Sequence, residues 1–207
     1  MTAKEAEEAT AQLKREFRSM MNGVASASMR QKGMDYAVNF GVESVRIAGL
    51  ARQTPHDAAL ARTLWMQRVR ECRLLATMVY PAEEFADDIC EAWLDTLHTA
   101  EEAQYLAMNL LRRLPYAATK VLEWTARENE LQQLCGFLTA GWLAADGTRF
   151  YGRERNELLD QCETALYSKN KLVARASFNA LQRFASQNYW QEREVEKIFS
   201  KFAEQNN

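Results

Sequence analysis

The chain has 207 residues, of which 47% are hydrophobic and 26% are charged, and its formal net charge is -2. This hydrophobic share is enough for one ordinary domain with its own core. The sequence contains no run of about 18 to 20 apolar residues such as a membrane span needs, and residues 1–18 are charged where a signal peptide would turn apolar. We therefore expect a cytoplasmic protein that has no membrane contact.

Helical periodicity runs through almost the whole chain. Between three prolines and eight glycines, apolar residues recur at spacings of three and four, which predicts helices and no strands. A first helix is predicted over about residues 3–21, ended by Asn22-Gly23, and a loop rich in Ser and Gly over 24–33. Thr54-Pro55-His56-Asp57 predicts a helix start at which Thr54 caps the free amides. Further helices are predicted over about residues 45–50, 57–65, 70–80, 82–97, 100–114, 116–124, 131–145, 152–166, 169–186 and 190–203.

About ten helices joined by short turns are typical of either a globular bundle or a solenoid of helix pairs. Trp65, Trp93 and Trp124 lie near the ends of successive predicted helices with similar separations, which favours the solenoid. The bundle remains the alternative, because the self-similarity is too weak to name a repeat.

The cysteines and histidines lack the spacing of a metal site. Cys72, Cys90, Cys135 and Cys162 are far apart, form no CxxC pair and lie in apolar helical sequence, so we expect buried free thiols. The two histidines stand apart from them and from each other, and the glycines form no nucleotide-binding motif. Neither a metal nor a cofactor is expected.

Charge is distributed unevenly along the chain. Between Leu74 and Leu111 there is no Lys or Arg, while eight acidic residues accumulate there. A basic run follows on the penultimate helix, and together with two arginines at the end of the acidic block it forms the candidate nucleic-acid-binding set. This set is Arg112, Arg113, Lys171, Arg175 and Arg183. Residues 171, 175 and 182 or 183 can share one helix face, as phosphate contacts require, although a solvated face would show the same pattern.

Several short strings follow one another in an order and spacing typical of a known family. They are Phe40-Gly41-Val42, Arg46-Ile47-Ala48, the segment from His56 to Trp65, the segment from Glu71 to Ala76, Met108-Asn109-Leu110, Pro115-Tyr116-Ala117, Glu123-Trp124 and Cys135-Gly136-Phe137. Together they cover roughly residues 39–188 and resemble the DNA alkylation repair family. The resemblance implies an all-α fold, a right-handed superhelix of antiparallel HEAT-like helix pairs, with a basic concave face that holds duplex DNA. It also implies hydrolytic excision of N3- or N7-alkylated purines.

Under this resemblance the whole chain, residues 1–207, is one helical-repeat domain. An N-terminal helix and loop cover residues 1–38, the family-like repeats cover 39–188, and a C-terminal helix covers 189–207. The resemblance further suggests that Glu71 and Arg73 tie adjacent helices together by polar contacts.

The sequence departs from the family at the positions that carry the chemistry. Aligned on Met108-Asn109-Leu110, the family's catalytic Asp falls at Gln104 and the preceding Trp at Ala100. A concave Arg of the family falls at Leu134, and a last aromatic residue of the site falls at Asn179. Gln is neutral and cannot stabilise a developing cation as a carboxylate does.

Glu101 is the candidate substitute for the lost acid, because it lies three residues from Gln104 and shares its helix face. The alternative is that Glu101 stabilises the first turn of its helix after Thr99. Two functions therefore stay open: a DNA glycosylase whose catalytic groups have been replaced, and a non-catalytic helical scaffold that binds nucleic acid or protein.

Overall fold

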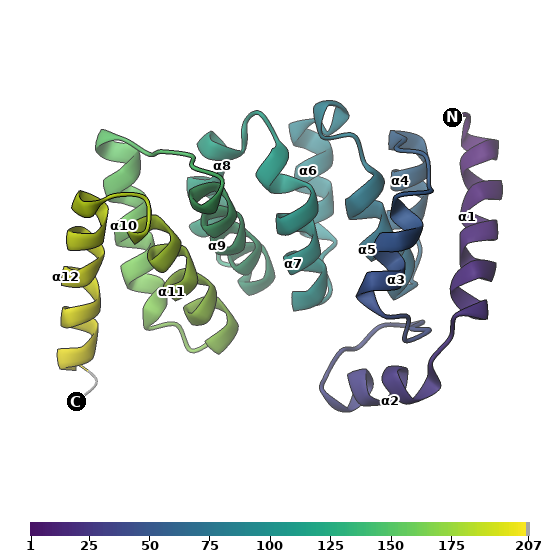
Figure 1. Cartoon of the computed structure of the whole chain (residues 1–207), viewed down its shortest axis with the longest axis horizontal. Helices are drawn as coiled ribbons and strands as arrows, with labels where there is room; N and C mark the ends of the chain where they lie inside the picture. The colour runs from purple at the N-terminus through teal and green to yellow at the C-terminus, as the bar shows by residue number, and fades with distance from the viewer. Residues whose placement is uncertain (206–207) are drawn as a thin grey trace. The chain divides into compact units, whose positions relative to one another are not determined.

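The structure, a computed structural model, describes residues 1–205 and is helical throughout (Figure 1). In this part of the chain there are twelve α-helices and two short 3-10 helices, and the only β-pairing is one isolated parallel bridge between Val38 and Val69. The prediction of helices without a sheet is confirmed. The chain divides into two compact units, Met1–Leu110 and Leu111–Asn207. Whether they make one domain stays a prediction.

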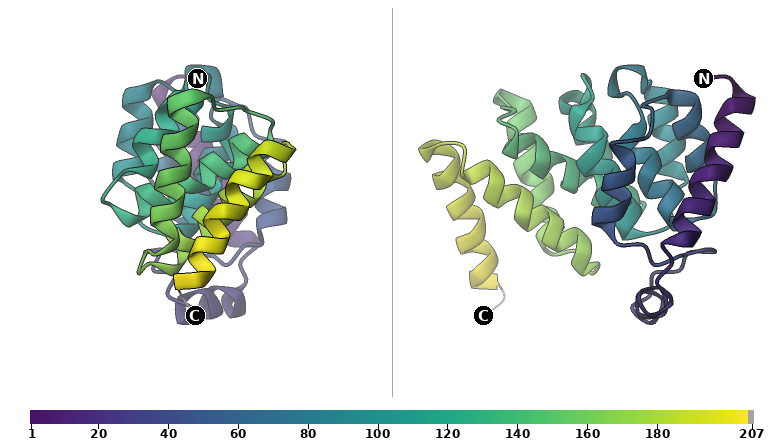
Figure 2. Two further views of the ribbon diagram at one scale, coloured as in Figure 1. Left: turned by 90° about the vertical axis from the view of Figure 1, so that its left-hand side faces the viewer. Right: turned by 45° about the vertical axis from the view of Figure 1, so that its right-hand side comes forward.

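Unit 1 contains seven α-helices and one 3-10 helix. They are α1 (Ala3–Ser19), α2 (Gly23–Gln31), α3 (Ser44–Ala51), α4 (Ala58–Trp65), α5 (Arg70–Val79), η1 (Ala82–Glu84), α6 (Asp87–Asp95) and α7 (Ala100–Asn109). Helix α5 is central, since it packs against α3, α4 and α7, and nine of its ten residues are buried. Helix α4 packs in turn against α1. The two further views show α2 lying crosswise to α1 (Figure 2).

Aromatic side chains fill the core between α4, α5 and α6. The rings of Trp65 and Trp93 stack with their centroids 4.1 Å apart, and Tyr80 and Phe85 meet Trp93 edge to face. Trp65 also donates from its indole nitrogen to Thr96 Oγ1 at 2.9 Å. These rings are therefore core residues with a satisfied polar atom, and they do not form an open stacking surface for bases.

Unit 2 contains one 3-10 helix and five α-helices. They are η2 (Leu111–Arg113), α8 (Ala117–Thr125), α9 (Glu130–Ala145), α10 (Gly152–Leu166), α11 (Lys171–Ala185) and α12 (Tyr189–Gln205). Helix α9 lies between α8 and α11. Gly136 lets it approach α8 closely, because a Cβ there would come within 2.7 Å of the backbone of Trp124 and Thr125.

Consecutive helices pair in the way HEAT-like repeats do. The pairs α4 and α5, α8 and α9, and α10 and α11 are each joined by a four-residue turn, over residues 66–69, 126–129 and 167–170, and pack side by side. Short connections of this kind make neighbouring helices antiparallel.

The interior of the helix layers is apolar, and the predicted buried free thiols are confirmed. Leu75, Leu110 and Trp124 are fully buried and Trp65 is 2% exposed. All four cysteines are buried with free thiols. Burial raises the pKa of the Cys72 and Cys162 thiols to about 12, so both are protonated at neutral pH. Among the described residues, no helix is both long and apolar enough to cross a membrane.

The predicted loop over residues 24–33 is wrong, since most of it forms α2. Asn22 does not end the first helix. Its side chain accepts from the Ala25 amide at 3.0 Å and caps the start of α2. The Ser26 hydroxyl then donates to the Asn39 carbonyl at 2.8 Å, so a serine that reads as a loop residue docks this helix on the segment before α3.

Three predicted boundaries also shift. Asp57, and not Thr54, caps α4 by accepting from the Leu60 amide, while the Thr54 hydroxyl donates to the Leu50 carbonyl and closes α3. The helix predicted over 82–97 is divided into η1 and α6, and the helix predicted over 100–114 ends at Asn109.

Candidate nucleic-acid interface

The position of the family's catalytic Asp is open to solvent and carries no charge. Gln104 lies on α7 and its side chain is exposed. Ala100, at the position of the preceding Trp, is the first residue of α7 and is half-buried. In unit 2, Leu134 is buried in α9 and Asn179 is exposed on α11. These four positions therefore offer neither a carboxylate nor an aromatic face to a cationic sugar.

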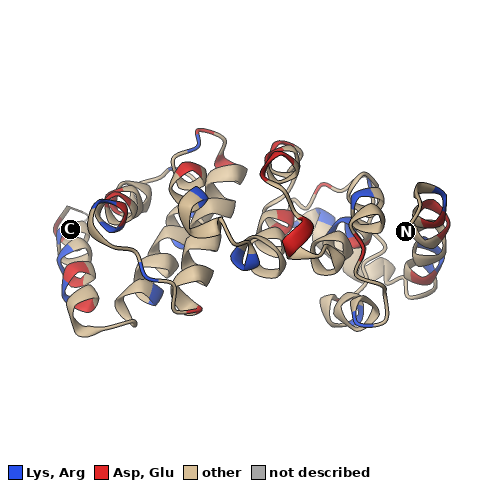
Figure 3. Ribbon diagram, turned by 90° about the horizontal axis from the view of Figure 1, so that it is seen from above, with Lys and Arg blue, Asp and Glu red and all other residues tan. Residues whose placement is uncertain are grey.

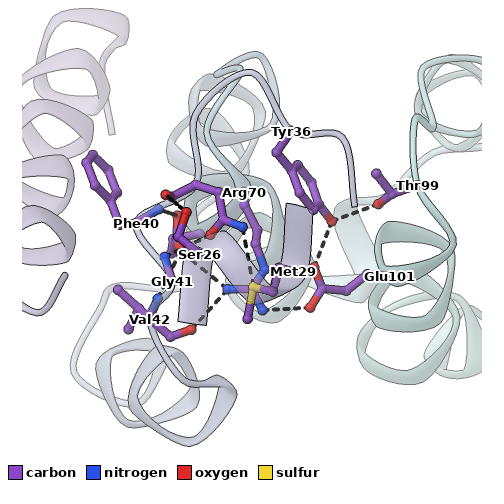
Figure 4. A network of polar contacts seen from close by, with 11 residues as sticks. Ser26, Met29, Tyr36, Phe40, Gly41, Val42, Arg70, Thr99 and Glu101 are labelled. Atoms are coloured by element: carbon purple, nitrogen blue, oxygen red, sulfur yellow. Dashed lines mark hydrogen bonds and ion pairs between the residues drawn. The ribbon is translucent and has the colours of Figure 1, made fainter. Parts of the chain in front are cut away.

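The Glu101 carboxylate is held by two other side chains (Figure 4). Arg70 donates to it from Nε at 2.7 Å and from Nη2 at 2.6 Å, and the Tyr36 hydroxyl donates at 2.8 Å. Burial opposes the charge of Arg70, but hydrogen bonds and charge from Glu101 raise the pKa of the guanidinium overall. Burial, with the nearby negative charge of Glu101, raises the pKa of Tyr36 as well. Glu101 thus lies in a closed ion-pair network, after the Thr99 cap of α7.

The same network fixes the segment before α3. Glu71 accepts from the amides of Phe40 and Val42, both at 3.2 Å, and Arg70 Nη1 donates to the Val42 carbonyl at 3.0 Å. Gly41 between them has a φ of +72°, and a Cβ there would come within 2.2 Å of the Asn22 carbonyl oxygen. The Phe40-Gly41-Val42 string is therefore a turn that only glycine can make here, and it packs onto α5.

Arg73 joins α5 to α7, as expected. Its Nε donates to Glu102 Oε1 at 2.7 Å and its Nη2 donates to Glu102 Oε2 at 3.1 Å. Nη1 and Nη2 also donate to the carbonyls of Trp65 and Thr96, respectively. Its guanidinium also lies 3.9 Å from the centroid of the Trp65 ring. Glu71 differs from the expectation, because it holds the segment before α3 and not a neighbouring helix.

A pocket of about 600 Å³ lies beside this network, lined in part by Tyr36, Trp65, Arg73, Thr96 and Glu102. Its buried polar groups are bonded to one another, Arg73 to Glu102 and Trp65 to Thr96. They leave no buried acid or base directed at a substrate, so this pocket carries no catalytic assignment.

The candidate basic residues all lie in unit 2. Arg112 and Arg113 are in η2, while Lys171, Arg175 and Arg183 are on α11. Arg113, Lys171 and Arg175 are exposed, and Arg112 and Arg183 are half-buried. Figure 3 shows acidic and basic residues interspersed along α1 and α12. Any attraction for a polyanion therefore depends on local clusters of like charge, such as the candidate basic residues of unit 2.

The structure brings two of these arginines together over one aromatic ring. The guanidinium carbon of Arg112 lies 4.3 Å from the centroid of the Trp142 ring, and that of Arg183 lies 4.2 Å from it. Arg112 also forms a two-point ion pair with Asp146, with Nε donating to Oδ2 at 2.7 Å and Nη2 donating to Oδ1. Asp146 is not among the site residues expected from the sequence. Its spacing of four residues from Trp142 was the available signal, since it puts the two residues on one helix face.

Two further tryptophans differ in their exposure to solvent. Trp124 is fully buried in α8, whereas Trp190 at the start of α12 is 75% exposed. In the described part of the chain, no three His, Cys, Asp or Glu residues gather as metal ligands.

Comparisons with known proteins agree with this helical architecture. The family model described as DNA alkylation repair enzyme matches residues 13–196. A solved structure described as a new family of proteins related to the HEAT-like repeat DNA glycosylases, with affinity for branched DNA structures, superposes with a TM-score of 0.79 at 16% identity. The match covers 91% of this chain and 80% of that one. None of the curated proteins compared with the chain matched it. Because the family model spans most of the sequence, the chain belongs to the DNA alkylation repair family, on a HEAT-like repeat fold.

Proposed function

We propose that this protein binds DNA through the basic residues of unit 2 and does not excise alkylated bases efficiently. The observation that carries the proposal is the pairing of Glu101 with Arg70 beside a neutral Gln104. The acid at the family position is absent, and the nearest carboxylate on the same helix face is already engaged by a buried cation.

The chemistry explains why this arrangement is unsuited to excision. An N3- or N7-alkylated purine is already a cation and leaves with little acid catalysis, so the enzyme's task is to stabilise the oxocarbenium sugar and position a water. A free carboxylate does both, and each ~1.4 kcal/mol of transition-state stabilisation that is lost costs about tenfold in rate. Glu101 would have to give up its two-point pair with the buried Arg70 guanidinium before it could serve, which adds a desolvation cost.

DNA binding rests on different residues. Arg112, Arg113, Lys171, Arg175 and Arg183 supply guanidinium and ammonium donors, which are the usual partners of phosphate oxygens. The structurally similar protein is described as having affinity for branched DNA structures. We extend that affinity to this chain as part of the proposal, with ordinary duplex DNA as the weaker ligand.

A paired assay tests both halves of the proposal. The purified protein is incubated with methylated duplex DNA, and released 3-methyladenine and 7-methylguanine are measured against spontaneous depurination. In parallel, binding to a duplex and to a four-way junction of equal length is titrated from low to high salt. We expect base release at the spontaneous rate, measurable binding at low salt, and tighter binding to the junction.

Each outcome bears on a separate half. Enzymatic release of either base would overturn the non-catalytic assignment and return Glu101 as the replacement acid. Absence of binding to both DNAs at low salt would overturn the DNA-binding assignment and leave a scaffold that binds protein. Equal affinity for the junction and the duplex would remove the branched-DNA preference alone.

A further inference from the structure

The Trp142 ring contacts two guanidinium groups, which carry like charges. Arg112 comes from η2 and Arg183 from α11, and both guanidiniums lie over the ring, 4.3 Å and 4.2 Å from its centroid. The ring quadrupole attracts each cation, while the two cations repel each other. In this structure Asp146 pairs with Arg112 and offsets the charge of that guanidinium.

Asp146 occupies an unfavourable place for a carboxylate. It is the C-cap of α9, where the partial negative charge of the helix end repels an acid. Its two oxygens instead accept from Nε and Nη2 of Arg112 in a two-point pair. This is the geometry in which arginine also binds phosphate, so Asp146 occupies the donors that a DNA phosphate would need.

The guanidinium of Arg183 lacks the carboxylate partner that Arg112 has in Asp146. Among the described residues, this guanidinium forms no ion pair and donates no hydrogen bond. The main contact of the guanidinium is therefore the Trp142 ring. The aliphatic part of the Arg183 side chain lies close to α9, since its Cδ would be 3.6 Å from a Cβ at Gly141. Stacking fixes the plane of the guanidinium and leaves its N–H groups available at the ring edge.

We infer that Trp142, Arg112 and Arg183 form a phosphate clamp whose second arm is masked by Asp146. Arg183 contacts a backbone phosphate first. The phosphate then displaces the Asp146 carboxylate from Arg112 and takes over its two-point pair. Trp142 is a positioning residue that holds both guanidiniums in place. This inference rests on the proposed DNA binding and specifies which groups make the contact.

The Asp146→Asn variant tests whether the Asp146 carboxylate blocks phosphate binding at Arg112. It removes the competing charge and leaves the side chain nearly isosteric, so DNA affinity at low salt should rise about fivefold, the effect of one unit charge roughly 4 Å away in a water-like dielectric. A purely structural role for Asp146 would instead weaken binding or lower the melting temperature.

The Arg183→Lys variant tests the contribution of the Arg183 guanidinium stacked on Trp142 without altering the net charge. Lysine stacks less well and cannot make a two-point contact, so binding should weaken severalfold. Arg193→Lys is the matched control, because Arg193 is an exposed arginine of α12 whose guanidinium lies near Glu196. It should bind like the parent. Trp142→Leu, compared at equal thermal stability, should reproduce the loss although both arginines remain.

The outcomes separate this inference from the proposed function. A parent protein that binds no DNA refutes the proposed function itself. A parent that binds, with Asp146→Asn no tighter and Arg183→Lys indistinguishable from Arg193→Lys, overturns the clamp and leaves DNA binding to other residues.

Discussion

Arg70 is a buried cation whose charge is matched by carboxylates from two elements. Its side chain is 1% exposed and pairs with Glu71 on its own helix and with Glu101 on α7. The two-point geometry with Glu101 and the further bond to the Val42 carbonyl satisfy the guanidinium in the interior. Glu101, the candidate acid expected from the sequence, is therefore the principal ion-pair partner of Arg70 in this structure.

Glu101→Ala should lower the free energy of unfolding by about 3 to 5 kcal/mol, because it leaves a buried guanidinium without its principal partner. Urea unfolding at neutral pH measures the change. Glu83→Ala is the control, since Glu83 is exposed in η1 and its loss should alter stability by less than about 0.5 kcal/mol. If the two variants unfold at the same urea concentration, the ion pair contributes nothing to stability and Glu101 is free to act in chemistry.

At the scale of elements, the contact between α8 and α9 depends on the missing side chain of Gly136. A Cβ there would meet the backbone of Trp124 and Thr125 at 2.7 Å, and backbone atoms cannot move aside as a flexible side chain can. Gly136→Ala should therefore force the helices apart and destabilise the protein by about 1 to 3 kcal/mol.

Gly49→Ala provides the matched comparison. Gly49 is also a helical glycine, in α3, but nothing lies within 4 Å of the position that a Cβ would take there. The same substitution should then leave stability unchanged or raise it by about 0.5 to 1 kcal/mol, because alanine loses less conformational freedom on folding. Thermal melting of both variants checks the pair, and equal shifts would show that the α8 and α9 contact tolerates a methyl group.

Leu110 tests the packing at the end of α7. It is the C-cap of that helix and is fully buried. Leu110→Ala should cost about 2 to 5 kcal/mol through lost burial and the cavity that remains. Met66, which is 76% exposed, gives the control substitution Met66→Ala. A Leu110→Ala protein that melts with the parent would exclude this core assignment.

At the scale of the whole molecule, charge separates the two units. Unit 1 has 12 Lys and Arg against 16 Asp and Glu, a formal charge of -4, while unit 2 has 14 against 12, a formal charge of +2. A polyanion is therefore attracted more strongly to unit 2, within the ~8 to 10 Å over which charges act in physiological salt.

Arg175→Glu should accordingly weaken DNA binding and flatten its dependence on salt by about 0.9 in the log–log slope, the value for one phosphate contact. The comparison is Arg68→Glu, which reverses an exposed arginine of unit 1 and should leave the slope as in the parent. Fluorescence anisotropy over a salt series measures both. Should Arg68→Glu flatten the slope and Arg175→Glu not, the DNA-facing surface would lie on unit 1.

The sequence by itself determined the helical class, the family and most helix positions, because helical periodicity and proline breaks are local and repeat along the chain. It also located Gln104 where the family has an acid. It missed α2, since a nine-residue helix rich in Gly, Ser and Ala is too short to be stable alone and depends on the Asn22 cap and the Ser26 bond to Asn39. Only the tertiary structure decided that Arg70 engages Glu101 and that Asp146 covers Arg112. These partners are 31 and 34 residues apart, and no local pattern specifies which distant charge a side chain will meet.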